Sequence, residues 1–114
     1  MSLVAIMIHV ADVEAGLRWY QHAFPAAVRK SIAEPFFEYL DLDGTSIEIV
    51  LADEKVASGA AGSVAYWHVT DFASALQHMQ SIGATLYRGP AEIEDGKRMC
   101  QVRDPWGNCI GLRG

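Results

Sequence analysis

Three side chains of this sequence carry donor atoms that divalent metals accept. His9 and His68 begin two similar runs, His9–Asp12 and His68–Asp71, and Glu48 lies within an apolar run. Two imidazoles and one carboxylate form a competent ligand set for Zn, Ni, Mn or Fe, with positions left for a substrate. This chemistry requires the three side chains to meet, so it depends on the helices and strands that position them.

The chain repeats itself. A shift of 59 positions places His9–Asp12 on His68–Asp71, and a later shift of 63 places Asp41 on Asp104. The difference, 63 − 59 = 4, predicts a short insertion in the second half, within 90–97. We therefore expect one domain over 1–114, made of two modules at about 1–52 and 63–114. A linker rich in Gly, Ala and Ser joins them at 53–62.

Each module has the pattern of one strand, one helix and three more strands (βαβββ), which predicts an α+β fold. The runs 3–10 and 63–69 are rich in β-branched and aromatic residues, as strands are. Asp12 and Asp71 then stand where they can cap a helix, and apolar residues follow at helical spacing. The remaining strands are predicted at 28–32, 36–42, 46–51, 85–88, 98–103 and 109–113.

Side chains alternate between the two faces of a strand, so position along the strand predicts the face. Ile47, Ile49 and Leu51 are expected to pack against the helix, which leaves Glu48 on the other face. The same alternation places His9 and His68 on the face without a helix.

These features resemble the vicinal oxygen chelate superfamily. The resemblance rests on the paired βαβββ modules, the matched His9 and His68, and the runs Ser46–Val50 and Asp104–Leu112. The superfamily includes glyoxalase I, extradiol dioxygenases, fosfomycin-modifying thiol transferases, methylmalonyl-CoA epimerase and bleomycin resistance proteins. The resemblance implies a cupped mixed sheet with helices on its outer face. It also implies metal ligands in the first and last strand of each module.

His9, Glu48 and His68 match three of those four ligand positions, and Gly111 stands at the fourth. Glyoxalase I has a second glutamate there, and glycine has no side chain to ligate a metal. The chain departs from glyoxalase I in this respect. A site with two histidines and one carboxylate is used by dioxygenases and thiol transferases of the superfamily, usually with the carboxylate in the second module.

Two function hypotheses follow. In the first, a glyoxalase-like lyase, isomerase, dioxygenase or thiol transferase uses a divalent metal to bind substrate oxygens and stabilise an oxyanion-type intermediate. His9, Glu48 and His68 are then the ligands, and Glu48 also carries a proton. In the second, a metal-free protein of the bleomycin-resistance kind sequesters a small hydrophobic or aromatic compound. Its pocket is expected to be lined by Phe37, Tyr39 and Tyr66, with Trp106 near the rim.

Each of these residues also has a purely structural interpretation. The histidines fit hydrogen-bonded positions in a sheet, Glu48 fits a solvated strand face, and the aromatic rings fit a core. Arg98 and Arg103 suit either an anionic substrate or solvent. Cys100 and Cys109 are interpreted as free thiols rather than nucleophiles. A third hypothesis is an accessory domain whose relevant feature is a dimer surface.

Composition limits the partners. The 114 residues carry 9 Lys and Arg against 14 Asp and Glu, a net charge of −5, without a basic block for nucleic acid. The apolar run at 3–8 is too short to span a membrane and lacks the signs of a leader. We expect a cytoplasmic protein with a small-molecule substrate or ligand and no membrane partner. We also expect a homodimer with shared sites, because exposed sheet edges need covering.

Overall fold

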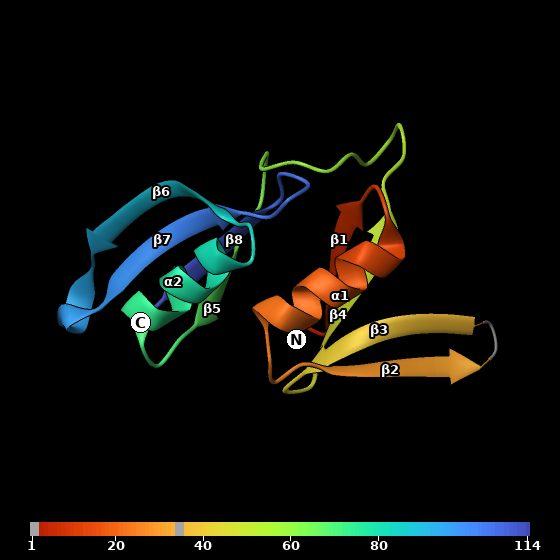
Figure 1. Ribbon diagram of the computed structural model, residues 1–114, viewed down its shortest axis with the longest axis horizontal. Coiled ribbons are helices and arrows are strands. Elements are labelled where there is room, and N and C mark those ends of the chain that lie inside the picture. The colour runs from red at the N-terminus through yellow and green to blue at the C-terminus, as the bar shows by residue number, and fades with distance from the viewer. Residues whose placement is uncertain (1–2, 34–35) are drawn as a thin grey trace. The chain divides into compact units, whose positions relative to one another are not determined.

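The computed structural model describes residues 3–33 and 36–114 of the chain. It divides into two compact units, unit 1 (Met1–Ser58) and unit 2 (Gly59–Gly114). In each unit one helix lies against one face of a four-stranded sheet (Figure 1). The predicted α+β fold of two βαβββ modules is confirmed.

Unit 1 has the strand order β1-β4-β3-β2, with β1 and β4 parallel and the other neighbours antiparallel. Unit 2 repeats this as β5-β8-β7-β6, again with one parallel pair, β5 and β8. The elements of unit 1 are β1 (Ala5–Val10), α1 (Val13–Ala23), β2 (Val28–Ala33), β3 (Phe36–Leu42) and β4 (Thr45–Leu51). Those of unit 2 are β5 (Ala65–His68), α2 (Phe72–Ser81), β6 (Thr85–Glu92), the 3-10 turn η1 (Glu94–Gly96), β7 (Arg98–Arg103) and β8 (Cys109–Arg113).

Both predicted helix caps are present. The Asp12 carboxylate accepts a hydrogen bond of 3.1 Å from the Ala15 amide, and Asp71 accepts one of 3.0 Å from the Ser74 amide. Each bond satisfies an amide that the first helical turn leaves without a partner. Over residues 3–33 and 36–114, neither helix has the length and apolar character needed to cross a membrane.

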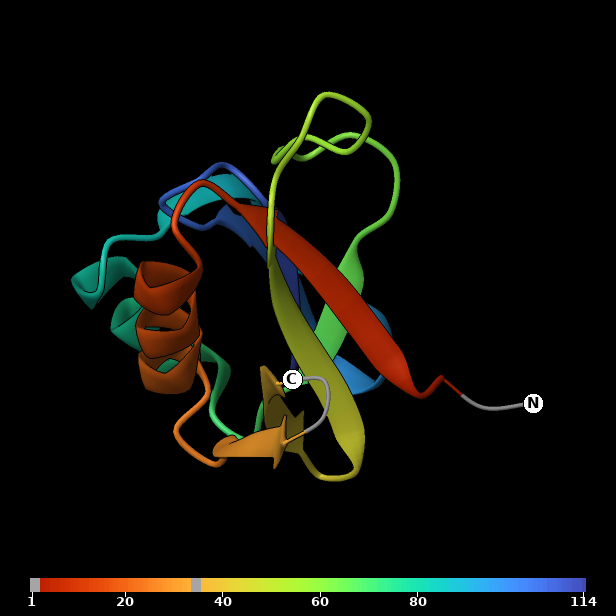
Figure 2. The same cartoon turned by 90° about the vertical axis from the view of Figure 1, so that its right-hand side faces the viewer.

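Each helix buries an apolar core against its sheet. Figure 2 shows α1 lying along one side of β1 and β4. Gly16 permits this close approach, because a Cβ there would lie 2.7 Å from Cγ2 of Ile49. The buried apolar residues of unit 1 are Val10, Leu17, Tyr20, Ala23, Phe24, Ala27, Leu40, Ile47 and Ile49. Those of unit 2 are Phe72, Met79, Ala84, Cys100, Val102, Ile110 and Leu112.

Two expectations differ from the structure. Leu51, predicted to pack against the helix, is 63% exposed because it is the last residue of β4. Strand β6 runs to Glu92, past the predicted end at residue 88, with irregular pairing to β7 after Leu86 and after Arg88. The four inserted positions are used for this longer strand and for η1, so they extend the sheet of unit 2.

Candidate functional site

In each unit, the sheet face opposite the helix carries the candidate residues, and we call it the open face. Glu48 pairs with Met7 and His9 pairs with Val50 across the parallel strands β1 and β4. Ile47 and Ile49 are buried on the helix side, whereas Glu48 and His9 are half-buried. His9 and Glu48 therefore lie on the open face of unit 1, on neighbouring strands.

The open face of unit 1 carries a hollow of about 420 Å³, the unit-1 hollow. The rings of Phe37 and Tyr39 stack there, with centroids 6.2 Å apart and planes 14° from parallel. Glu48 lines the same hollow, and its carboxylate accepts a hydrogen bond of 3.2 Å from the Ser46 hydroxyl. The hollow is lined by Ile32, Phe37, Tyr39, Asp41, Gly44, Ser46 and Glu48.

The two carboxylates of the unit-1 hollow differ in their partners. The Lys30 ammonium lies 2.7 Å from Asp41, and together with the Gly44 amide it holds the pKa of the Asp41 carboxyl below its usual value. Asp41 in turn raises the pKa of Lys30. Among the described residues, no cation of unit 1 forms an ion pair with Glu48. Glu48 is thus the carboxylate of this hollow that can receive a cationic group.

In unit 2, a tyrosine ring fills the position that corresponds to Glu48. Tyr66 pairs with Gly111 across β5 and β8, as Met7 pairs with Glu48 across β1 and β4. A Cβ on Gly111 would lie within 2.6 Å of the Cγ and Cε1 atoms of Tyr66, so the ring covers the glycine. Glycine at 111 is what allows the ring to lie flat on the sheet.

Two neighbours hold the Tyr66 ring in place. The Gln101 side-chain amide donates a hydrogen bond of 2.8 Å to the Tyr66 hydroxyl. The guanidinium carbon of Arg113 lies 4.3 Å from the ring centroid, a cation–π contact. Gly111, which stands where the superfamily pattern has its fourth metal ligand, is therefore covered by the Tyr66 ring. The hydroxyl of this ring contacts Gln101, and its face contacts Arg113.

A second hollow of about 280 Å³, the unit-2 hollow, lies beside Tyr66. His68 lines it and is exposed at the end of β5. Besides Tyr66 and His68, the lining consists of Trp67, Ile93, Glu94, Lys97 and Arg113. Alternation along the last strand places Arg113 on the open face with Cys109 and Gly111, but no sequence pattern indicated that Lys97, which follows η1, lines this hollow.

Trp106 lines neither of these two hollows. It belongs to the turn between β7 and β8, where its amide donates to the Asp104 carboxylate at 2.8 Å. Asp104 is only 4% exposed and also accepts from the Asn108 amide at 2.8 Å and the Asn108 side chain at 3.0 Å. The structure thus places Trp106 in a turn organised by a buried carboxylate.

The donors that the sequence suggested for a metal belong to different units. His9 and Glu48 lie on the open face of unit 1, and His68 lies in unit 2. Within the described part of each unit, three or more His, Cys, Asp or Glu side chains do not gather into a metal site. Imidazole and carboxylate donors suit a transition metal, but a set of all three must draw on both units. The Tyr66 ring leaves the position at Gly111 without a donor.

Cys100 and Cys109 are free thiols on the two faces of one hairpin. Cys100 is buried on the helix side and Cys109 is half-buried on the open face. Burial raises the pKa of the Cys100 thiol. Burial also raises the pKa of the Cys109 thiol, more than the nearby Arg103 and Arg88 lower it. Neither thiol has the lowered pKa that a nucleophile needs.

Comparison with known proteins gives one family and several solved structures. The family model described as Glyoxalase/Bleomycin resistance protein/Dioxygenase superfamily matches residues 2–112. No curated protein sequence matches the chain.

The solved structures agree with this chain over nearly their whole length. An integron cassette protein from the mobile metagenome of V. Cholerae is 20% identical, with a TM-score of 0.77 over 99% of this chain and 94% of that one. A superfamily member from Sphaerobacter thermophilus is 18% identical, with a TM-score of 0.77 over 99% and 96%. A family enzyme from Burkholderia phytofirmans is 21% identical, with a TM-score of 0.75 over 99% and 98%. At these identities the likeness concerns the fold.

Proposed function

Because the chain belongs to the glyoxalase/bleomycin resistance protein/dioxygenase superfamily, we propose that it binds a small organic molecule on the open face of unit 1. The ligand is a flat, apolar compound that carries a positive charge. The observation that carries this proposal is the stacked pair Phe37 and Tyr39 in one hollow with Glu48. Two parallel rings offer a flat apolar surface, and a neighbouring carboxylate selects a cation.

The charge of the units supports a cationic ligand. Unit 1 contains 4 Lys and Arg against 9 Asp and Glu, so its net charge is 4 − 9 = −5. Unit 2 contains 5 of each and is neutral. The whole negative charge of the chain therefore resides in the unit that carries the stacked rings, where it attracts cations.

Binding can be tested with a cationic and a neutral probe that share one ring system. We expect 2-naphthylmethylammonium to shift the amide NMR signals of residues that line the unit-1 hollow. Glu48→Gln should weaken its binding about fivefold, because it removes a charged hydrogen-bond acceptor from a partly exposed site. Tyr39→Leu should weaken it by about the same factor through loss of the ring face.

Glu54→Gln is the matched control, since it removes the same charge from an exposed residue between β4 and β5. It should leave binding within about twofold of the original, because exposed charges at a distance are screened by salt. Equal weakening by Glu54→Gln and Glu48→Gln would mean that only net charge matters. Equal binding of the neutral 2-naphthalenemethanol would also contradict the proposal.

A second candidate function is favoured by a separate observation, the shared open face of His9 and Glu48 on neighbouring strands. Together with His68 these residues would hold Zn, Ni, Mn or Fe. When bound, such a metal polarises substrate oxygens as a Lewis acid. Glu48 then stands on the face where its carboxylate can also accept a substrate proton. This candidate makes the protein a metal-dependent enzyme of the superfamily.

Metal retention tests this candidate directly. We expect untagged protein dialysed against Zn²⁺ or Ni²⁺ to retain one ion per chain in elemental analysis. His9→Ala and His68→Ala should each weaken retention by about tenfold or more, since even changes outside the ligand shell reach that size. His22→Ala, on an exposed position of α1, is the control. No retained ion, or an equal effect of His22→Ala, would refute the metal site.

A further inference from the structure

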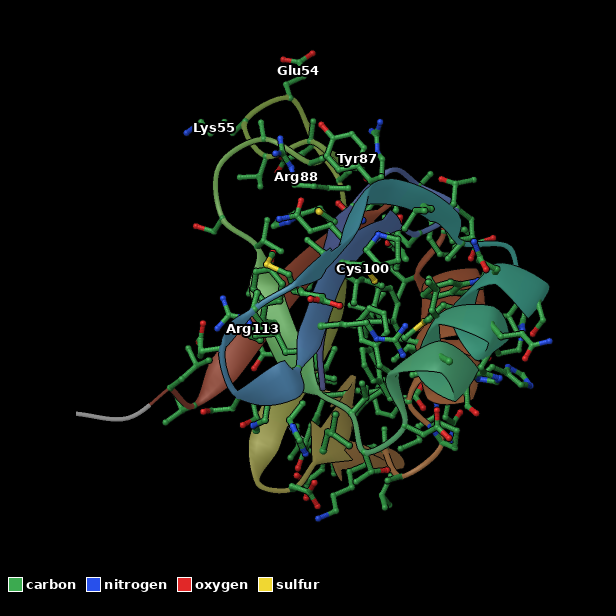
Figure 3. The ribbon with its side chains drawn as sticks, turned by 90° about the vertical axis from the view of Figure 1, so that its left-hand side faces the viewer. Glu54, Lys55, Tyr87, Arg88, Cys100 and Arg113 are labelled. Atoms are coloured by element: carbon green, nitrogen blue, oxygen red, sulfur yellow. The ribbon has the colours of Figure 1, made fainter. Side chains whose placement is uncertain are left out.

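The open face of unit 2 carries arginines from three of its strands. Strand pairing places Arg88 opposite Gln101, Arg103 opposite Cys109, and Arg113 opposite Met99, all on this face. Figure 3 shows Arg113 on the side of β7 and β8 that faces away from α2, and Cys100 on the helix side. The sequence allowed Arg98 as a contact for an anionic substrate. In the structure Arg98 lies on the helix side, with its guanidinium carbon 4.8 Å from the ring centroid of Phe72.

The acidic residues of unit 2 lie elsewhere. Asp71 caps α2, Asp104 is buried in the turn before β8, and Glu92 pairs with Arg98 on the helix side. Glu94 and Asp95 belong to η1. Although unit 2 is neutral as a whole, the strands of its open face therefore expose cations without acids between them. Such an arrangement attracts anions.

In the part of the chain that the structure describes, the cations that line the unit-2 hollow form no ion pair with a carboxylate. Among residues 3–33 and 36–114, the ion pairs Arg18–Glu14, Arg29–Glu14, Arg29–Glu38 and Lys30–Asp41 all lie in unit 1, and none is seen between a carboxylate of unit 2 and Lys97 or Arg113. The guanidinium carbon of Arg113 lies over the Tyr66 ring, 4.3 Å from its centroid. The guanidinium carries five N–H donors in a planar fork, which can bind a carboxylate in two-pronged fashion.

We propose that the unit-2 hollow binds a small organic anion, a carboxylate attached to a flat ring. Arg113 and Lys97 bind the carboxylate, and Tyr66 and Ile93 form apolar walls for the ring. Glu94 is the acid of this hollow and opposes binding. The site uses residues of unit 2 alone, so it does not depend on the function proposed for unit 1.

The pairing of Tyr66 with Gly111 explains why this site takes an anion. In unit 1 the corresponding pair is Met7 and Glu48, which presents a carboxylate to the open face. In unit 2 the carboxylate is absent, and the ring that replaces it supports an arginine. The two halves of the repeat thus differ in charge on their open faces: Glu48 is matched by Gly111, and Arg113 stands at the position that matches Val50.

The test is an NMR titration of the full chain with 2-naphthoate. We expect the amide signals of Tyr66, Lys97 and Arg113 to shift, and those of the unit-1 hollow to stay in place. Arg113→Gln should weaken binding about fivefold, because the site loses its two-pronged donor. Glu94→Gln should strengthen binding about twofold by removing a like charge. Neutral 2-naphthalenemethanol should bind at least about fivefold more weakly than the anion.

Arg98→Gln is the matched control, since it removes the same charge from the opposite face of the same sheet. It should change the affinity less than about twofold. The proposal is overturned if Arg98→Gln weakens binding as much as Arg113→Gln, or if the neutral alcohol binds as tightly. Shifts confined to residues outside the unit-2 hollow would overturn it as well.

Discussion

Replacement of Gly111 by glutamate should lower the free energy of unfolding by about 4 kcal/mol, through overpacking and loss of solvation. The glutamate restores the fourth carboxylate of the superfamily pattern, but its Cβ would overlap the Tyr66 ring. The ring cannot simply turn aside, because Gln101 binds its hydroxyl and Arg113 covers its face. Urea unfolding followed by circular dichroism measures the effect.

The structure also predicts what relieves this loss. Tyr66→Met combined with Gly111→Glu copies the pair Met7 and Glu48 of unit 1. In a double-mutant cycle the two changes should couple favourably by about 2 kcal/mol or more, because the smaller side chain removes the overlap. Gly111→Ala, which introduces only the Cβ, should by itself cost about 2 kcal/mol.

Two results would contradict this interpretation of Gly111. If Gly111→Ala were neutral, the ring would be free to move and would not explain the glycine. If the cycle showed additive effects, the loss caused by Gly111→Glu would have a cause other than Tyr66.

Replacement of Asp104 by alanine should lower the free energy of unfolding by about 3 kcal/mol, since it removes a charged acceptor with several bonds. This carboxylate is buried and accepts from the Trp106 amide, the Asn108 amide and the Asn108 side chain. Without it the turn between β7 and β8 has buried donors with no acceptor. Asn108 also accepts from the Gly59 amide, so the loss extends to the start of unit 2. Urea unfolding measures the change, and amide exchange should locate it in 104–108.

Asp41 provides a control from the repeat itself. It occupies the position that matches Asp104 and accepts from the Gly44 amide at 3.0 Å, but it is partly exposed and its partner is Lys30. Asp41→Ala should therefore destabilise the protein clearly less than Asp104→Ala. Equal losses at the two positions would show that burial of Asp104 is not the cause.

Local patterns in the sequence were sufficient for the fold. Repeat spacing predicted two βαβββ modules, aspartates before apolar periods predicted both caps, and alternation around Ile47 and Ile49 predicted which face carries Glu48. These features depend on residues close in the chain or on the geometry of one strand, so they can be inferred without a structure.

The sequence by itself determined the repeat, the α+β fold, the faces of the strands and the absence of a carboxylate at Gly111. Only the tertiary structure decided what replaces that carboxylate and how the hollows are lined. Tyr66 and Gly111 are 45 residues apart in the chain and meet through strand pairing. Lys97 reaches the unit-2 hollow through an irregular turn, whose path no periodicity encodes. Such contacts depend on the packing of distant segments, and here that packing gives two matched halves different chemistry.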